Sequence, residues 1–286
     1  MSVSSVTHQR VPRSALRVYR GVWAMWTQLG EQARFFLRTV AALPDVLVNY
    51  RGELLRQIAA MSLGTGSLAV IGGTVAVTTF LTMSTGGALA SEGYNQLSNI
   101  GVEALTGFAS AFANTRLVTP STGAFAFAAT IGAGATAQLG AMRINEEIDA
   151  LEVMGIRPIA YLAATRVAAG VVVAVPLYCV ALILGYSSGR VVTTVFYGQS
   201  GGVYTHYFNT FFIPSDAVRS FVVSLAVVTA IMLIHTYYGF AAKGGPAGVG
   251  EAVGRATRAS LIVAVFVILF VTLALYGQTG DFNFAG

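Results

Sequence analysis

Residues 259–280 read ASLIVAVFVILFVTLALYGQTG, a stretch without a single charged side chain. A helix that crosses the hydrocarbon core of a bilayer needs about 20 mostly apolar residues. Four further charge-free runs of at least that length precede it: 57–91, 117–142, 167–189 and 220–242. The sequence therefore predicts an all-α integral membrane protein with five transmembrane helices, contained in residues 57–280.

The composition excludes several other classes of protein. Charged residues make up 10% of the 286 residues and apolar residues 55%, whereas a soluble domain carries roughly 25% charged residues. A soluble, disordered or nucleic-acid-binding protein is thereby excluded. The single cysteine, Cys179, excludes an intrachain disulfide and a cysteine-based metal cluster.

The basic residues are unevenly distributed about the five runs. Fourteen of the 17 lie before the first run, between the second and third, or between the fourth and fifth. Basic residues collect on the cytoplasmic side of membrane proteins. We therefore expect a cytoplasmic N-terminus and an external C-terminal tail, residues 281–286. No short apolar segment with a cleavage site precedes the first run, so no cleavable signal peptide is expected.

The second run has an irregular beginning. A shorter apolar piece, 104–115, precedes it, with Arg116 and Pro120 at the junction. Because proline within a helix removes a hydrogen bond and bends the helix, we expect the second span to be long or bent near Pro120.

Residues 1–56, the cytoplasmic N-terminal region, contain a helical pattern. Apolar residues recur at steps of three and four: Tyr19, Val22, Trp23, Trp26, Leu29, Ala33, Phe36, Leu37 and Val40. Arginines and other polar residues fall largely on the opposite side. This pattern predicts an amphipathic helix in the cytoplasmic membrane interface. A soluble helix packed on a partner protein is the alternative.

Residues 143–158, RINEEIDALEVMGIRP, are the most polar segment between two spans. Asn145 is the expected N-cap of a short helix, acidic residues occupy its first turn, and Gly155 and Pro158 follow its end. Ile148 and Leu151 fall on one side, with Ile144. An exposed connector needs no apolar stripe, so we expect this helix to dock into another protein or surface; a solvated connector is the alternative.

On the outer side, residues 190–216 are too polar to span a membrane but rich in aromatic side chains. They are Phe196, Tyr197, Tyr204, Tyr207, Phe208, Phe211 and Phe212. Aromatic residues are typical of the membrane interface. We expect an external aromatic loop that lies in the interface or contacts an extracellular partner.

Small residues form two ridges in the first and second spans. The glycines are Gly64, Gly66, Gly72 and Gly73 in the first, and Gly132, Gly134 and Gly140 in the second. Small side chains let helices approach closely in lipid. The ridges indicate ordinary helix packing, or else a lipid pathway or a permease interface.

Motifs for chemistry are sparse. The only lysine, Lys243, cannot complete a P-loop, and the three histidines lie apart without a metal-binding motif. His235, beside Tyr237, is an intramembrane ionisable residue and so a functional candidate, but a neutral, hydrogen-bonded histidine explains it equally. Residues 198–202 match G-x-S-x-G around Ser200, but the strand–turn–helix that this motif requires is not visible.

Two stretches resemble a known family. Residues 132–143, GAGATAQLGAMR, continue into 146–151, EEIDAL, with Met154, Gly155 and Pro158 after them. The glycine-rich segment 244–250 also matches. This order is similar to that of the MlaE/YrbE permeases over nearly the whole chain, and most like the B-type YrbE subunits of mycobacterial Mce lipid-import complexes.

The resemblance implies a plasma (inner) membrane permease subunit of an ABC-type lipid importer. A second YrbE-type permease would pair with this chain, a separate cytoplasmic ABC ATPase dimer would use the ATP, and Mce proteins would lie outside. No cofactor bound by this chain, no metal site and no nucleic-acid partner are implied, and the chain itself would not be an enzyme. The segment 143–158 would contain the coupling helix, with Glu146, Glu147, Ile148, Asp149, Leu151, Met154 and Gly155 at the ATPase contact.

Two positions depart from the family pattern. Many relatives have Glu where this chain has Gln138, and Arg where it has Thr130, which favours an asymmetric, heterodimeric pair of permeases. The sequence leaves open whether the lipid is a fatty or mycolic acid, a phospholipid or a sterol. An integral membrane enzyme that modifies lipid and a non-transporting membrane scaffold are the rival functions.

Overall fold

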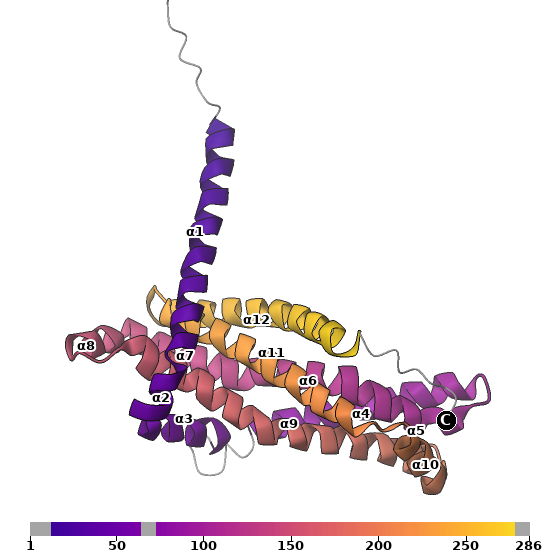
Figure 1. The fold of residues 1–286 in the computed structure, drawn as a ribbon. Helices are drawn as coiled ribbons and strands as arrows, with labels where there is room; N and C mark the ends of the chain where they lie inside the picture. The colour runs from indigo at the N-terminus through magenta and orange to yellow at the C-terminus, as the bar shows by residue number, and fades with distance from the viewer. Residues whose placement is uncertain (1–12, 64–72, 278–286) are drawn as a thin grey trace, which may run out of the picture.

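The computed structural model describes residues 13–63 and 73–277, and every regular element in these ranges is helical (Figure 1). Three helices come first: α1 (Arg13–Ala41), α2 (Leu43–Asn49) and α3 (Arg51–Leu63). α4 (Thr74–Ser98) follows, and a short 3₁₀ turn, Glu103–Leu105, leads into the next long helix. The predicted all-α fold is thus confirmed for the described part of the chain.

Four of the helical stretches are long and apolar enough to cross a membrane: Glu103–Ile144, Ile159–Phe196, Pro214–Phe240 and Gly245–Tyr276. The first contains α5 (Thr106–Ala109), α6 (Thr119–Phe127) and α7 (Ala133–Ile144). The others are α9 (Thr165–Val191) with its extensions, α11 (Pro214–Phe240) and α12 (Gly245–Tyr276). These stretches correspond to the second to fifth predicted spans, although the fourth run, 220–242, and the fifth, 259–280, extend beyond the ends of their helices.

The first predicted span, 57–91, falls on two helices, α3 and α4, and residues 64–72 between them lie outside the described residues. α4 packs along α9 inside the bundle. The count of five transmembrane helices is therefore not confirmed, although α4 runs with the bundle in Figure 1.

The long stretch Glu103–Ile144 is continuous and contains two π-helical segments, Ser110–Val118 and Ala128–Gly132. Pro120, in the first turn of α6, has no amide hydrogen to donate to the preceding turn. A wider π turn directly before it accommodates this loss without ending the helix. The expectation of a long second span that is irregular near Pro120 agrees with this helix.

Residues 190–216, expected as an external loop, are largely helical. α9 continues through a π-helical segment, Val192–Phe196, and α10 (Gly201–Phe211) follows after a short turn. Tyr204 is buried in this region. Its burial against the end of the bundle gives α10 a packed face, which a sequence rich in glycine and aromatic residues did not indicate.

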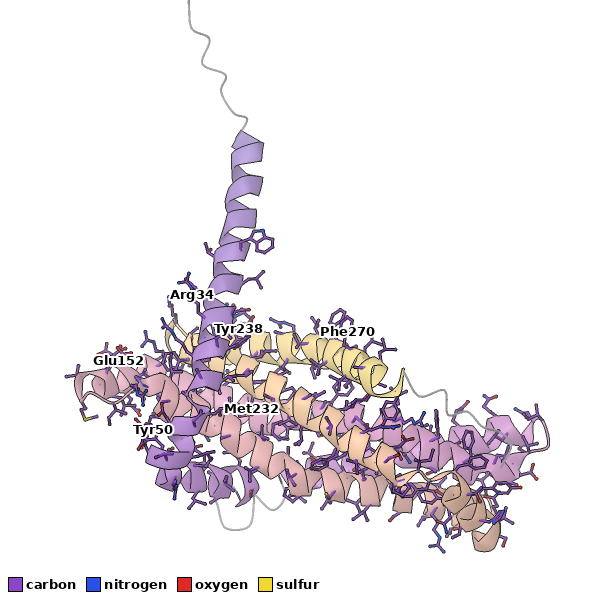
Figure 2. The ribbon with its side chains drawn as sticks, viewed as in Figure 1. Arg34, Tyr50, Glu152, Met232, Tyr238 and Phe270 are labelled. Carbon is purple, nitrogen blue, oxygen red and sulfur yellow. The ribbon has the colours of Figure 1, made fainter. Side chains whose placement is uncertain are left out.

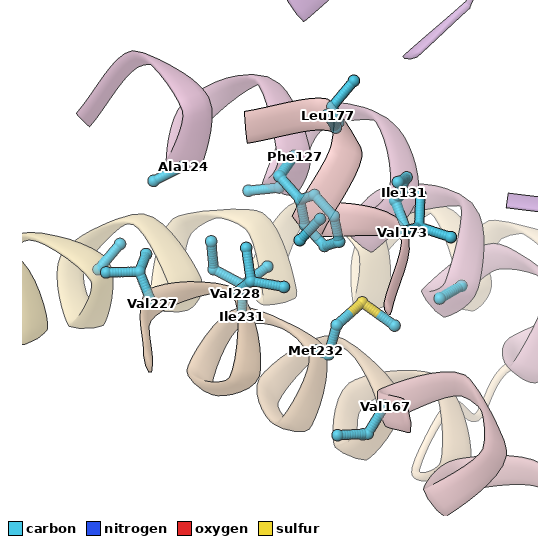
Figure 3. Close-up of a cluster of buried hydrophobic side chains, with 14 of the residues drawn as sticks. Ala124, Phe127, Ile131, Val167, Val173, Leu177, Val227, Val228, Ile231 and Met232 are labelled. Atoms are coloured by element: carbon cyan, nitrogen blue, oxygen red, sulfur yellow. The ribbon is translucent and has the colours of Figure 1, made fainter. Parts of the chain in front are cut away.

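The core of the bundle is formed by side chains from α6, α7, α9, α11 and α12. Phe127 and Ile131 meet Val173 and Leu177 of α9 and the α11 residue Ile231 (Figure 3). All five are less than a tenth exposed. By contrast, many large apolar side chains point outward, among them Phe270 of α12 (Figure 2), as expected of helices that face lipid or a neighbouring subunit.

Gly86 makes the closest approach between α4 and α9. A methyl group at this position would lie 2.7 Å from the carbonyl oxygen of Gly185. We therefore expect Gly86→Ala to push the two helices apart and to lower the free energy of unfolding by about 1–3 kcal/mol. Gly52→Ala in α3 is the matched control, because a methyl there meets no atom within 4 Å. Denaturation in mixed micelles would measure the free energy of unfolding of the two variants. Equal stability of Gly86→Ala and Gly52→Ala would contradict the close contact between α4 and α9.

Candidate functional site

The segment predicted as the coupling helix forms α8 (Glu147–Val153) at one end of the bundle, which we call the α8 end (Figure 1). α10 lies at the opposite end, the α10 end. Asn145, the expected N-cap, instead caps the end of α7, and Glu146 precedes α8 with a left-handed φ of 60°. α8 stops in a Schellman motif: the amides of Gly155 and Ile156 bond the carbonyls of Glu152 and Leu151, both at 3.0 Å. Gly155 suits its place there because its φ is +76°.

Ile148 anchors α8 to its own chain. Its side chain is fully buried against Leu139 of α7 and Leu162, with Leu151 packed beside them. The apolar stripe read from the sequence is therefore partly covered within this chain. Ile148 cannot itself enter a groove of another protein, which corrects its assignment to the contact with the ATPase.

The rest of α8 is exposed and acidic. Asp149 bonds Arg143, Nη1 to Oδ1, at 2.6 Å. Glu146, Glu147 and Glu152 are exposed and form no ion pair with another described residue. Figure 2 shows Glu152 at this end of the molecule.

Two apolar side chains stand out on the same exposed surface. Val153 is 90% exposed and Met154 65% exposed. Exposed apolar side chains rimmed by charge are typical of a protein interface. The surface formed by Glu147, Asp149, Glu152, Val153 and Met154, here called the α8 surface, is therefore the best candidate for a partner contact.

A cavity of about 380 Å³ lies beside α8, toward the N-terminal helices. Its lining includes Arg38 of α1, Asp45 of α2, and Glu152 and Arg157. Arg157 also bonds Asp45, Nη2 to Oδ2, at 2.9 Å. The segment after α8 is therefore tied to the N-terminal helices.

A polar network that the sequence did not indicate connects α3 to the start of α9. The carboxylate of Glu53 accepts hydrogen bonds from Arg56 Nε at 2.8 Å, Gln57 Nε2 at 2.6 Å and the Tyr161 hydroxyl at 3.4 Å. Burial raises the pKa of the Glu53 carboxyl, but the hydrogen bonds and the nearby positive charges of Arg56 and Arg166 outweigh burial, so the pKa lies below its ordinary value. Glu53 is therefore a charged link between the two helices.

The predicted glycine ridges have different surroundings. Gly132 lies against the ring of His235, and Gly140 against Val249 of α12. A methyl at Gly134 would meet no atom within 4 Å. Gly73 is exposed and precedes α4, while Gly64, Gly66 and Gly72 lie outside the described residues. Among the described glycines of the second span, only Gly134 thus faces open space where a lipid or another subunit can approach.

His235 belongs to the interior of the bundle. Its Nδ1 lies 2.7 Å from the Thr136 hydroxyl and its Nε2 lies 3.0 Å from the Ser260 hydroxyl, and the side chain is fully buried. Both ring nitrogens thus have partners on α7 and α12. This arrangement fits the structural interpretation of His235 as a hydrogen-bonded core residue.

The other residues of the enzyme hypothesis do not gather around His235. Tyr237 stacks edge-on with Phe35 of α1, with ring centroids 5.5 Å apart. Ser200 precedes α10 and makes no side-chain capping bond. Among the described residues, no nucleophile, base and acid are brought together here, so the geometry favours a surface for assembly over a catalytic centre.

The family model described as Permease MlaE matches residues 64–274, nearly three quarters of the chain. The chain belongs to the MlaE permease family. It is accordingly a multi-pass inner-membrane protein, and its family is one of transport subunits.

Several relatives of this MlaE permease have been named. A probable ABC transporter permease of Synechocystis is 28% identical over 167 residues, which cover 58% of this chain and 64% of the relative. The chloroplastic protein trigalactosyldiacylglycerol 1 of Arabidopsis thaliana is 28% identical over 187 residues, or 65% of this chain and 53% of the relative. The Haemophilus influenzae MlaE, named an intermembrane phospholipid transport system permease protein, is 24% identical over 193 residues, or 67% of this chain and 74% of the relative. The chain thus spans between half and two thirds of the length of the first two.

At the α10 end of this MlaE permease lies an ion-pair cluster that the sequence did not indicate. Asp216, 5% exposed, accepts a hydrogen bond from Arg116 Nε at 2.7 Å and another from Arg219 Nη1 at 3.2 Å. The Arg116 guanidinium also lies 4.4 Å from the ring centre of Phe112 and 4.7 Å from that of Tyr276. The cluster joins three long helices. Its members are far apart in the sequence, so no local pattern indicates that they meet.

Proposed function

We propose that this chain is the transmembrane permease subunit of an ABC-type lipid importer. It pairs with a second YrbE-type permease as a heterodimer, receives ATP-driven motion from a separate cytoplasmic ATPase dimer, and takes lipid from Mce proteins outside. Family membership supports the permease role, and the name of the Haemophilus relative supports lipid as the cargo. The pairing and the Mce partners rest on the sequence resemblance.

The observation that carries this proposal is the α8 surface. Its acids and its two exposed apolar side chains are held in place by the buried Ile148 and by the Schellman motif. A rigid, charged projection at one end of the bundle suits a contact through which motion is transmitted. Glu147, Asp149, Glu152, Val153 and Met154 then face the ATPase, while Leu151 supports them.

Mass spectrometry of the complex, extracted gently from its own membranes through a tag on this chain, tests the proposal. We expect one second permease, an ATPase dimer and bound lipid in the same particle. A chain that is recovered without any ATPase and that modifies lipid by itself would replace the permease with the enzyme hypothesis. A chain that is recovered without an ATPase and that does not modify lipid would leave only the scaffold hypothesis.

The proposed topology has five spans, with α3 and α4 in the region of the first, the N-terminus inside and the C-terminus outside. Two features support it. The basic connections between the second and third spans and between the fourth and fifth spans lie at the α8 end, and α1 runs steeply away from the long helices in Figure 1, as a helix in the membrane plane would. The exposed side chains of Trp26, Leu29 and Leu37 suit an interfacial position.

Cysteine labelling checks this topology. In a Cys179→Ser background, we expect an impermeant maleimide added to whole cells to label Asn283→Cys but not Ser5→Cys, because the positive-inside rule places only the C-terminus outside. Both positions should react after the membrane is permeabilised. Labelling of Ser5→Cys alone in whole cells would reverse the orientation.

The exposed face of α7 around Gly134 is the proposed contact with the second permease and the lipid pathway. Gly134 has open space beside it, and the neighbouring Ala137 and Gln138 are exposed. In lipid, such small residues allow close approach of another helix. Gly132 and Gly140, by contrast, serve packing within this chain.

A further inference from the structure

A second cavity, of about 310 Å³, lies at the α10 end between α9 and α10. Among its lining residues, Tyr186, Ser187 and Arg190 lie three, four and seven positions after Ile183, so the four share one face of α9. The opposite wall is formed by α10 residues: Tyr204, Thr205, Phe208 and Asn209. None of these residues belongs to the α8 surface or to the Gly134 face.

The two ends of this cavity differ in chemistry. Ile183 is 62% exposed on the lipid-facing side of α9, and the rings of Tyr186 and Phe208 are 5.1 Å apart in the wall. At the other end Arg190 lies near Gly201, the first residue of α10, with Thr205 one turn further along this helix. The cavity is thus apolar toward the bilayer and cationic toward its surface.

Arg190 has no carboxylate partner in the part of the chain that the structure describes. Among the described residues no carboxylate lies within ion-pair distance of its guanidinium, although Arg116 and Arg219 at the same end share Asp216. The guanidinium Nη2 also comes within 4.0 Å of a methyl placed on Gly201, the first residue of α10. The partial positive charge of a helix N-terminus there adds to the positive potential of Arg190.

The depth of Arg190 matches a lipid headgroup. The charge-free run 167–189 of α9 is about 34 Å long at 1.5 Å per residue, close to the roughly 30 Å of the hydrocarbon core. Arg190 follows directly after this run and so lies at the level of the headgroups. Ile183 lies about 10 Å deeper, two helical turns away, at the level of the acyl chains.

We propose that this cavity binds an anionic membrane amphiphile. Its phosphate or carboxylate pairs with Arg190 and accepts a hydrogen bond from Thr205, and its chain lies along the Ile183 face of α9. The guanidinium fork suits either anion, because both offer two oxygens to it. The proposal rests on the membrane position of α9 and not on the ATPase or permease partners, so it can fail or succeed independently of the proposed function.

A tryptophan placed in the wall reports on the occupant. The full chain carries Trp23→Phe, Trp26→Phe and Phe208→Trp, so that its only tryptophan is in the cavity wall. It is reconstituted into phosphatidylcholine bilayers that contain a small fraction of a lipid with brominated acyl chains. Bromine quenches tryptophan fluorescence on contact. We expect brominated phosphatidylglycerol or brominated fatty acid to quench the introduced tryptophan at about one tenth of the mole fraction that brominated phosphatidylcholine requires. A charge-assisted hydrogen bond has about the strength for this tenfold preference.

Three variants locate the source of the preference. Arg190→Gln should abolish it, Arg190→Lys should retain part of it, and Arg255→Gln should leave it unchanged, because that variant removes an exposed arginine from α12 near the α8 end. Circular dichroism identifies any variant that fails to fold, and Ser187→Phe, which fills the cavity while keeping Arg190 and adds no second tryptophan, then serves in its place and should also abolish the preference. The brominated fatty acid and phosphatidylglycerol arms distinguish a carboxylate from a phosphate headgroup.

Several results would overturn the proposal. Equal quenching by all brominated lipids, or an undiminished preference in folded Arg190→Gln, would show that Arg190 binds no headgroup. If the lipids are not distinguished but Arg190→Gln loses an external protein from the purified complex, Arg190 pairs with an acidic protein instead. If inorganic phosphate abolishes the preferential quenching by brominated anionic lipid, the cavity binds a free anion and not an amphiphile.

Discussion

Met154→Asp is expected to remove the ATPase from the purified complex while the permease remains folded. Met154 is 65% exposed beside the acids of α8, so a carboxylate there stays solvated in the free chain but is buried unpaired in the proposed contact. Truncating a central interface residue weakens binding by about 2 kcal/mol or more, about 30-fold in affinity. Copurification of the ATPase, together with lipid uptake, measures the effect.

Ile148→Asp also replaces an apolar side chain of α8 with a carboxylate, but at a position that is buried within this chain and not exposed. Ile148 is fully buried against Leu139 and Leu162, and an unpaired carboxyl there should destabilise the docking of α8 by about 3–5 kcal/mol. This variant should therefore lose both the ATPase and the ordered α8, which limited proteolysis detects. Met154→Leu is the control that keeps size and polarity. Full recovery of ATPase with both Met154→Asp and Val153→Asp would exclude the α8 surface as the contact.

Asp216→Asn is expected to destabilise the α10 end more than any exposed charge change. The substitution removes the negative charge that Arg116 and Arg219 share and leaves two guanidinium groups against a neutral amide in a mostly buried site. Breaking a buried ion pair in this way lowers the free energy of unfolding by about 3 kcal/mol or more. Unfolding in mixed micelles measures the change.

Glu251→Gln is the matched control for Asp216→Asn. It breaks the Arg255–Glu251 pair, whose side chains are both largely exposed, and such surface pairs contribute less than about 1 kcal/mol. Replacing Arg116 and Asp216 together by leucine should restore part of the stability, because only Arg219, the more exposed of the two arginines, then lacks its partner. Equal destabilisation by Asp216→Asn and Glu251→Gln would contradict the structural role of the cluster.

Four of the five predicted spans correspond to long apolar helices, and they were predictable because a bilayer imposes a local rule. A helix must remain apolar over about 20 consecutive residues, so the charge-free runs predicted α9, α11, α12 and the long helix of α5 to α7 without knowledge of their neighbours. Residues 190–216 follow no such rule. Tyr204 is buried only because α10 meets the end of the bundle, a long-range contact that leaves no local pattern.

The candidate site was predictable only in part, for a related reason. Periodicity placed Ile148 and Leu151 on one side of α8, but it cannot tell whether the surface that covers them belongs to this chain or to a partner. In the structure α7 and the segment before α9 cover Ile148. Likewise Arg116 and Asp216, and Thr136 and His235, are about a hundred residues apart in the sequence, and a single sequence does not indicate such pairs.

The ties that hold α8 have a mechanical consequence. Ile148 fixes α8 to α7 and to the start of α9, Asp149 holds Arg143 at the end of α7, and Arg157 beyond α8 holds Asp45 of α2. A displacement of α8 therefore moves α7, the segment before α9 and α2 together with it, because these contacts leave no flexible loop between α8 and the bundle. In the proposed contact with the ATPase, the stiffness of this junction would set how much of a nucleotide-driven displacement reaches the spanning helices.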